Sequence, residues 1–331
     1  MNSKTDITII MPTYNRAAVL RETLAALAGV DRGALRVELV VIDNNSNDQT
    51  ADVLCEFARR LPLRALFEPQ PGKNKALNRA LTEVELGEIV LFTDDDVTPA
   101  ADWLHAVWDA AQRWPQYQVF GGRIEVCWPP GAVPGWAEVP FIKAFGFAHH
   151  DYAPDERPYG PGHFPFGPNY WVRRTVFDDG RRFCENIGPH PTNRILGDET
   201  LFLKQLREDG HEQLYCPRAV VQHRIQPEAL SAAAIKRRAA TLGRGGPLVG
   251  GLCRRQLLDQ HPLLWRSLRH AALWYYRLRY LLAQLTPDPD QRVVRSVQAI
   301  INIAYNAASL ELAARRAPAA AATGSQPAAA L

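Results

Sequence analysis

The sequence has few of the residues that cross-link small proteins. Its five cysteines are Cys55, Cys127, Cys184, Cys216 and Cys253. They are dispersed, odd in number and form no C-x-x-C pair, which argues against a disulfide framework or a zinc site. We therefore expect reduced thiols in a cytosol.

Long apolar segments are also missing. No window of about 18 residues is apolar and free of charge, so we expect no membrane-spanning helix. The nearest candidate, residues 263–285, contains four arginines and a histidine. The apolar run near the N-terminus has about five residues, too few for the core of a signal peptide. We expect a cytoplasmic protein, with peripheral contact on the inner face of the cell membrane as a further expectation discussed below.

A strong charge of one sign is absent too, since the formal net charge is +3. The charge is unevenly spread. Residues 235–280 hold ten Lys and Arg against one acid, Asp259, so the rest of the chain carries about −6. No recognition motif for nucleic acid accompanies this basic segment, and we expect no nucleic-acid partner.

What the chain does have is a hydrophobic fraction of 47%, enough for a packed core. Up to residue 126, short apolar runs alternate with helical stretches, which predicts an α/β fold with a mostly parallel sheet covered on both faces. The predicted strands are 7–11, 37–43, 63–68, 88–94 and 118–126, and the predicted helices are 16–27, 49–60, 73–84 and 100–113.

This alternation stops at residues 128–168, which contain nine prolines and nine aromatic residues. We expect no regular helix or central strand there, and a connection of this length is usually a functional loop. Regular structure should resume with a strand in 169–177, a helix over 198–209 and two short strands at 213–216 and 219–223. Basic helical sequence continues to residue 316, and the Ala- and Pro-rich residues 317–331 resemble a disordered tail.

Two acidic sites follow predicted strands. Asp94, Asp95 and Asp96 end the fourth strand, where ligands bind in open parallel sheets. Adjacent carboxylates need a cation or donors, and Mg²⁺ or Mn²⁺ binds one or two carboxylates together with substrate phosphates; a helix cap with an acidic first turn explains the run equally well. Asp43 ends the second strand, where it could accept from a base or ribose or form an Asx turn.

Seven motifs in order resemble family 2 glycosyltransferases with the GT-A fold. They cover about residues 5–225, two-thirds of the chain. The motifs are PTYNR (12–16), VVIDNNSNDQT (40–50), GKNKALNRAL (72–81), FTDDD (92–96), FGPNYWVRR (166–174), GDETLFLKQLREDG (197–210) and YCPRAVVQH (215–223).

The resemblance implies a role for each matching residue. The residues implied to contact the nucleotide sugar are Pro12, Thr13, Tyr14, Asn15, Asp43, Lys75, Asn78, Asp94 and Asp95. Asp96, in the position of the family's DxD motif, would hold Mn²⁺ or Mg²⁺, with His223 as either a further metal ligand or an ordinary strand-end residue. Trp103, Gly121 and Gly122 fall where the family shapes the floor of the acceptor cleft.

The catalytic base of inverting members lies in a Glu-Asp pair that opens a helix. This chain has the reverse order, Asp198-Glu199. By register Glu199 occupies the base position, and Asp198 would serve if the helix began one residue differently. A base must be ionised at working pH, which a helix N-terminus favours.

The resemblance therefore implies an inverting transfer from a nucleoside-diphosphate sugar, with UDP as the default, to a hydroxyl of a glycan or lipid-linked acceptor. The alternatives are a non-catalytic nucleotide-sugar or glycan-binding scaffold and a sugar nucleotidyltransferase. A nucleotidyltransferase would need a Gly-rich phosphate loop after the first strand, where this chain has PTYNR.

We expect three parts in the chain. Residues 1–225 form the GT-A domain, with a nucleotide-sugar half (1–124) and an acceptor half (125–225). A basic helical extension (226–316) and the tail (317–331) follow. Leucines and aromatics at helical spacing within 263–285, interleaved with arginines, resemble a helix that lies on anionic lipid, and equally a helix docked on the body with solvated arginines.

Overall fold

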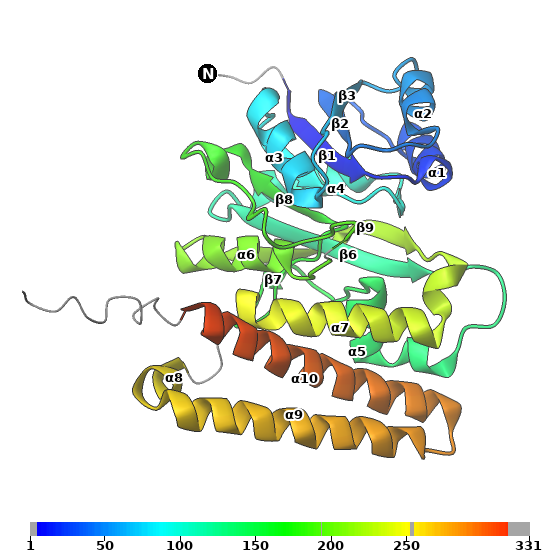
Figure 1. Ribbon diagram of the computed structural model, residues 1–331. Coiled ribbons are helices and arrows are strands. Elements are labelled where there is room, and N and C mark those ends of the chain that lie inside the picture. Colours follow the sequence, from blue (N-terminus) through cyan, green and yellow to red (C-terminus); the bar gives the residue numbers. More distant parts are fainter. Residues whose placement is uncertain (1–4, 193, 252–254, 317–331) are drawn as a thin grey trace, which may run out of the picture.

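The computed structural model describes residues 5–192, 194–251 and 255–316. Within them lies a mixed sheet of nine strands with helices around it (Figure 1). The strands are β1 (Ile7–Thr13), β2 (Val37–Asp43), β3 (Leu63–Phe67), β4 (Ile89–Phe92), β5 (Val97–Pro99), β6 (Val119–Cys127), β7 (Arg157–Pro158), β8 (Tyr170–Arg173) and β9 (Gln213–Arg224).

The helices of the body alternate with these strands and are followed by a helical extension. They are α1 (Ala17–Ala28), α2 (Thr50–Phe57), α3 (Lys73–Glu83), α4 (Trp103–Arg113), α5 (Pro140–Phe147), α6 (Asp198–Glu208), α7 (Ala232–Val249), α8 (Arg255–Gln260), α9 (Pro262–Gln284) and α10 (Pro289–Arg316).

The strand order is β3-β2-β1-β4-β8-β6-β9-β5, with β7 beside β9. The first four strands are parallel to one another, and β6 is parallel to β9. Antiparallel pairs all involve β5, β7 or β8. The predicted α/β sheet between helices, with a helical extension after it, is confirmed.

The sheet has a hydrophobic core on each face because its central strands are apolar at successive positions. In β1, Ile9 and Met11 pack into the core beneath α1, α2 and α4, whereas Ile10 faces the core beneath α3 and α6. A strand buried on both faces has no polar side to alternate with. This is why the first predicted strands agree with the observed ones to within about two residues.

Two expectations after residue 127 are wrong, and one strand before it was missed. The Pro- and aromatic-rich residues 128–168 contain a regular helix, α5, which begins with Pro140 at a first-turn position, where the missing proline N–H costs nothing. The two strands expected at 213–216 and 219–223 are one strand, β9. The short strand β5 after the acidic run was not expected at all.

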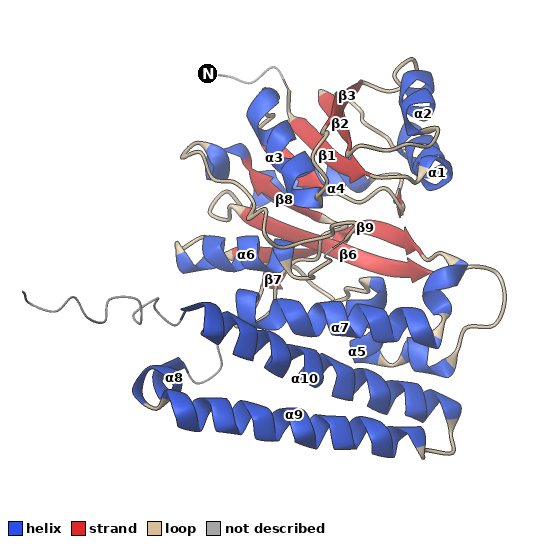
Figure 2. Ribbon diagram, in the orientation of Figure 1, coloured by secondary structure: helices blue, strands red, loops and turns tan. Residues whose placement is uncertain are grey.

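The helical extension is stacked in layers against the body. Figure 1 shows α10 between α7 and α9, with α9 outermost and farthest from the sheet. Figure 2 shows that this lower part of the molecule is helical. Ile235 of α7 and Val297 of α10 share a core with Trp136, Ile142 and Phe147 of the 128–168 segment, so the extension and that segment pack together.

None of the helices in the described part of the chain is both long and apolar enough to cross a bilayer. The division at residue 225 and the tail stay predictions, and residues 317–331 lie outside the described residues.

Candidate functional site

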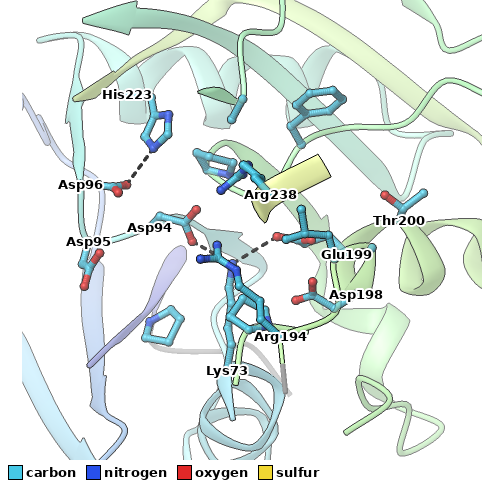
Figure 3. A pocket seen from close by; sticks show the side chains of 18 of the residues that line it. Lys73, Asp94, Asp95, Asp96, Arg194, Asp198, Glu199, Thr200, His223 and Arg238 are labelled. Atoms are coloured by element: carbon cyan, nitrogen blue, oxygen red, sulfur yellow. Dashed lines mark hydrogen bonds and ion pairs between the residues drawn. The ribbon is translucent and has the colours of Figure 1, made fainter. Parts of the chain in front are cut away.

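A cavity of about 630 Å³ opens where the parallel strands end (Figure 3). Its wall includes the end of β1 and the acidic run after β4 on one side. Residues 165–168, residues 189–191, Arg194, residues 196–200, α5 and α7 complete it. The position agrees with the rule that open parallel sheets bind ligands beyond the carboxyl ends of their strands.

The loop after β1 is fixed by the loop after β2. Asn15 has a positive φ of 51°, a conformation that asparagine adopts more readily than most residues. Its backbone N–H donates to Ser46 Oγ at 2.9 Å, and its Oδ1 accepts from the Asn47 N–H at 2.8 Å. Pro12, Thr13 and Tyr14 line the cavity, while Asn15 holds the two loops together behind them.

The three aspartates after β4 have different partners. Asp94 pairs with Lys73 at 2.8 Å. Asp95 accepts from Thr13 Oγ1 at 2.7 Å and pairs with Arg16 at 2.5 Å, and the same guanidinium reaches Asp96 at 2.8 Å. Burial raises the pKa of Asp95 to about 6, although Arg16 opposes this shift.

Asp96 also faces His223, although 127 residues separate them in the chain. Strands β5 and β9 are antiparallel, with Val97 opposite His223. His223 Nδ1 lies 2.7 Å from the Phe147 carbonyl and so must carry the proton, which leaves Nε2 facing Asp96 Oδ1 at 3.3 Å. Burial opposes the charged form of both groups, but their mutual attraction lowers the pKa of Asp96 and raises the pKa of His223.

Lys73 joins the acidic run to the predicted catalytic pair. It is the first residue of α3, and its Nζ lies 2.8 Å from Asp94 Oδ1 and 3.2 Å from Glu199 Oε1 (Figure 3). Burial disfavours its charge, but the two carboxylates outweigh burial and raise the pKa of Lys73 well above its usual value. Lys73 therefore stays protonated between them.

Asp198 and Glu199 open α6 with opposite electrostatic characters. Burial raises the pKa of Glu199, but the Lys73 ammonium lowers it more, to about 2. Burial and the neighbouring Glu199 charge raise the pKa of Asp198 well above its usual value. Within the described residues, the buried Asp198 Oδ2 has no hydrogen-bond partner. Glu199 is therefore the ionised member of the pair at neutral pH.

Several predicted site residues lie outside the cavity wall. Asp43 Oδ1 accepts from the Ser46 N–H at 2.9 Å, which is the Asx turn that the sequence left open. Lys75 Nζ donates to Gln70 Oε1 at 2.8 Å beside a second, smaller cavity. Asn78 donates to the Phe183 carbonyl at 2.9 Å and so anchors the 178–188 segment.

The three residues expected at the floor of the acceptor cleft are packed behind its wall. Trp103 is fully buried and donates from Nε1 to Asn169 Oδ1 at 3.0 Å. A Cβ on Gly121 would collide with Tyr159 and Pro165, and one on Gly122 would collide with Asn169. These positions support the 165–169 segment rather than contact the cavity directly, so their expected contact with an acceptor is corrected to support from behind.

Sequence reasoning missed four cations of the cavity wall: Arg16, Lys73, Arg194 and Arg238. Lys73 had a signal, because it is the first helical residue after Gly72, whose φ of 133° suits only glycine. Arg238 donates from Nε to the Phe145 carbonyl at 2.8 Å and lies in α7, where nothing in the sequence separates it from the other basic residues. Burial lowers the pKa of Arg238 to about 10.

Comparison with known proteins gives relatives of one kind. The chain is 22% identical over 222 residues to glycosyltransferase AglE of Haloferax volcanii, which covers 67% of each chain. It is 38% identical over 90 residues to poly(ribitol-phosphate) beta-N-acetylglucosaminyltransferase TarS of Staphylococcus aureus, which covers 27% of this chain and 16% of TarS.

Solved structures share the fold. The mannosyltransferase PcManGT from Pyrobaculum calidifontis, in complex with GDP-Man and Mn²⁺, superposes with a TM-score of 0.58 at 21% identity, over 93% of this chain and 88% of that one. TarS residues 1–349 in complex with UDP superpose with a TM-score of 0.51 at 17% identity, over 94% and 92% of the two chains.

A family model decides the assignment. The model described as glycosyl transferase family 2 matches residues 8–181, more than half of the chain. The matched segment contains β1 to β4, and it includes the end of β1, the acidic run and Lys73, which line the cavity. The chain belongs to glycosyl transferase family 2 and is a glycosyltransferase of GT-A fold.

Proposed function

We propose that this glycosyltransferase inverts the anomeric centre of a nucleoside-diphosphate sugar, a UDP-sugar, as it transfers the sugar to a hydroxyl of a glycan or lipid-linked acceptor. The observation that carries the proposal is the ionised Glu199 at the start of α6, in the same cavity as the Asp94–Asp96 run. A single displacement needs one base on the acceptor side and charge stabilisation on the leaving-group side.

Glu199 is the proposed base. A base removes the proton of the attacking hydroxyl as the bond to the sugar forms, so it must be ionised and accessible. Glu199 meets both conditions, with a pKa of about 2 and a side chain that lines the cavity at 23% exposure. Asp198 is 3% exposed and its pKa is raised, which makes it the weaker candidate.

The loop after β1 and the acidic run form the proposed donor side. Pro12, Thr13 and Tyr14 would lie against the nucleotide, and Asp94 and Asp95 against the sugar and ribose hydroxyls. Asn15 and Asp43 would act by fixing the loops after β1 and β2, and Lys75 and Asn78 stay proposed contacts of the nucleotide sugar. The UDP assignment draws support from TarS, a relative whose structure was solved with UDP.

Asp96 and His223 are the residues that would hold a divalent cation. A carboxylate oxygen and an unprotonated imidazole Nε2 suit Mn²⁺ and also Mg²⁺, and PcManGT was solved with Mn²⁺. The described residues contain no group of three or more His, Cys, Asp or Glu arranged as a metal site, so substrate phosphates and water would complete the coordination. When bound, the cation supplies Lewis-acid stabilisation of the departing diphosphate.

Arg238 and Arg194 supply further positive charge to the same cavity. Among the described residues, neither side chain has a carboxylate partner within ion-pair distance. The negative charges of Glu199, Asp96 and Asp94 act to raise the pKa of Arg238 against the effect of burial, because Arg238 lies near both acidic sites. We assign it to the phosphates of the donor, whose negative charge grows as the sugar leaves.

A donor panel with the matched variants Glu199→Gln and Asp198→Asn tests the proposal. UDP-, GDP- and dTDP-sugars are supplied with Mn²⁺ or with chelator, and NMR gives the anomeric configuration of the product. We expect an inverted product with one donor class. Glu199→Gln should lose about 10²–10⁴-fold in kcat, with nucleotide binding retained, and Asp198→Asn much less. A product that retains configuration, or a fully active Glu199→Gln, would contradict the proposal.

A further inference from the structure

The exposed apolar side chains of this protein are concentrated on one helix. Among the described residues, twelve large hydrophobic side chains are exposed, and nine of them lie within residues 263–285, on α9 and the residue that follows it. They are Leu263, Leu264, Leu268, Trp274, Tyr275, Leu278, Leu281, Leu282 and Leu285. Scattered exposed hydrophobics are normal, whereas a continuous set marks an interaction surface.

These side chains form one face of α9. At about 100° per residue, Trp265, Leu273 and Ala283 point to the same side of the helix, and these are the residues of α9 that are buried. Leu278 and Leu282 project from the opposite side, together with Trp274 and Tyr275, and they are 52–69% exposed. Helix α9 is therefore apolar both toward α10 and toward solvent. We call the solvent-facing set the outer face of α9.

Arginines border this outer face on both edges. Arg266 and Arg277 lie on one edge and Arg279 on the other, by the same angular count. Arg277 stacks over Trp274, and Arg279 stacks over Tyr275 and donates to its hydroxyl at 3.0 Å. Helix α9 contains no Asp or Glu. Arg269 is the exception in position, because it points inward to Asn306 and Trp265.

We propose that the outer face of α9 binds an anionic lipid bilayer, with the helix lying flat in the interface. Leucines and aromatics would enter the boundary between headgroups and acyl chains, and the bordering arginines would extend to the phosphates. The helix cannot span instead: its length is about 34 Å at 1.5 Å per residue, but it carries four arginines and does not qualify as a membrane-crossing helix.

The positive charges beside the outer face of α9 favour an anionic bilayer, and not a second copy of the chain, as its binding partner. Pairing two α9 helices by their outer faces would bring the arginines of both copies together with no acid on either helix to compensate them. An anionic lipid surface compensates all of them at once and contributes about 1 kcal/mol for each Arg or Lys near it. The apolar set and its arginine borders thus fit one occupant.

The position of α9 leaves the cavity open to substrates. Helix α9 is the outermost layer, and α10 lies between it and α7, whose Arg238 and Leu242 line the cavity. Binding through α9 would hold the enzyme at the membrane without covering the cavity wall. The inference stands on the surface of α9 alone and does not depend on the proposed chemistry.

Vesicle co-sedimentation of the full chain tests it, with no donor or acceptor present. The probes are vesicles of phosphatidylglycerol mixed with phosphatidylcholine, and vesicles of phosphatidylcholine alone, each at low and high salt. We expect binding to the anionic vesicles that weakens with salt, and much weaker binding to the neutral ones. No binding to anionic vesicles would overturn the proposal.

Matched variants locate the surface. Leu278→Asp with Leu282→Asp should reduce the affinity at least about tenfold for each leucine removed from the interface. Arg266→Gln with Arg277→Gln should reduce it about fivefold for each arginine, on anionic vesicles only. Phe67→Asp on β3 is the control, because Phe67 is 51% exposed and Leu278 is 55% exposed; it should bind as wild type does.

A fluorescence measurement on the unaltered surface provides a second readout. Trp274 is 69% exposed, so brominated lipid should quench part of the tryptophan emission, and Trp274→Phe should remove that part. Equal quenching in Trp274→Phe would overturn the proposal. So would a wild-type dimer that the Leu278→Asp and Leu282→Asp changes convert to a monomer while vesicle binding stays the same.

Discussion

Two acidic runs face each other across the cavity, Asp94–Asp96 and Asp198–Glu199. Within each run, neighbouring carboxylates have different pKa values. In the run after β4, the pKa of Asp95 is raised to about 6 by burial, while that of Asp96 is lowered by His223 and Arg16 against the effect of burial. At the start of α6, the pKa of Asp198 is raised and that of Glu199 is lowered to about 2.

The two runs differ in the cations that shift the pKa values of their acids. In the first run, Asp96 contacts Arg16, which directly precedes α1, and His223, which lies in β9. In the second run, Lys73 of α3 pairs with Glu199 and lowers its pKa. Lys73 also pairs with Asp94, so it contacts both runs. Adjacent acids thus differ in charge because some of these contacts are not shared. Arg16 contacts both Asp95 and Asp96, but only Asp96 also faces His223, and Lys73 pairs with Glu199 and not with Asp198. Order along the sequence does not decide the role.

The largest effect should come from the first run. Asp96→Asn removes a carboxylate that we assign to the metal, and kcat/KM should fall about 10²-fold or more, since this stabilisation is worth several kcal/mol. Nucleotide binding should also lose its dependence on Mn²⁺. Asp95→Asn is the variant to compare with it, because the Asp95 side chain contacts Thr13 and Arg16 and is not assigned to the metal. Wild-type rates in excess chelator would remove the metal role.

The Glu199 side chain can be displaced by a substitution at a neighbouring residue, Gly167, while Asp198 and Glu199 themselves stay unchanged. A Cβ on Gly167 would collide with Glu199 Oε1, the end of a flexible side chain that can move aside. Gly167→Ala should therefore lower kcat up to about 10²-fold by misplacing the base, with little change in Tm. Gly29→Ala is the control, since the nearest atom to its added Cβ is 3.4 Å away. A large loss of Tm would point to a packing role instead.

Lys73→Gln separates the two runs and should shift a pH profile. In the wild type the pKa of Glu199 is about 2, so any fall in kcat/KM between pH 8 and about pH 5 comes from other groups, such as Asp95 with its pKa of about 6, and not from the base. Without the ammonium, burial raises the pKa of Glu199, and activity should fall as the pH drops through the new value. An unchanged acid limb would mean that Glu199 is not the base. Lys75→Gln, on the same helix but bonded to Gln70, is the control.

Arg16→Gln should cost stability because it leaves Asp95 and Asp96 without their shared cation. Breaking a buried pair costs about 3–5 kcal/mol, and the Arg16 side chain is 34% exposed, so we expect about 1–3 kcal/mol in urea unfolding. Arg21→Gln is the matched change in α1. Its pair with Glu56 is exposed on both sides, and the loss should stay below about 1 kcal/mol. Equal losses in the two variants would contradict this distinction.

Asp198→Asn should have the smallest effect, and its sign depends on pH. A carboxyl whose pKa is raised on folding favours the folded state at low pH, and that contribution is lost as the pH rises through the unfolded and then the folded value. Asparagine does not titrate, so the variant should gain stability relative to wild type between pH 4 and pH 8. Parallel curves for Asp198→Asn and wild type would contradict the raised pKa.

The donor half of the fold was predictable because its signals are local. Strands buried on both faces are continuous apolar runs, and polar residues at their ends must gather at one edge of the sheet. This argument located the Asp94–Asp96 run, and the family resemblance added Pro12, Thr13 and Tyr14; all of them line the cavity. In 128–168, composition misled: proline at the first turn of α5 starts that helix rather than preventing it.

The cavity residues that sequence reasoning missed are those that reach it through long-range packing. Arg194 and Arg238 carry no sequence signal of their own, and only tertiary contacts place them at the cavity, whereas Lys73 had the signal of its place after Gly72. The expected nucleotide contact of Lys75 and Asn78 stays a prediction; these residues share a helix with Lys73 but bond to Gln70 and to the Phe183 carbonyl.

The sequence by itself determined the family, the alternation of strands and helices, and the identity of the acids, because these follow from residue order and local periodicity. Only the tertiary structure decided which acid is charged. The charge of Glu199 depends on Lys73, and the partner of Asp96 depends on the β5–β9 pairing that brings His223 opposite Val97. It also decided which side of α9 faces solvent, because that depends on where α10 packs.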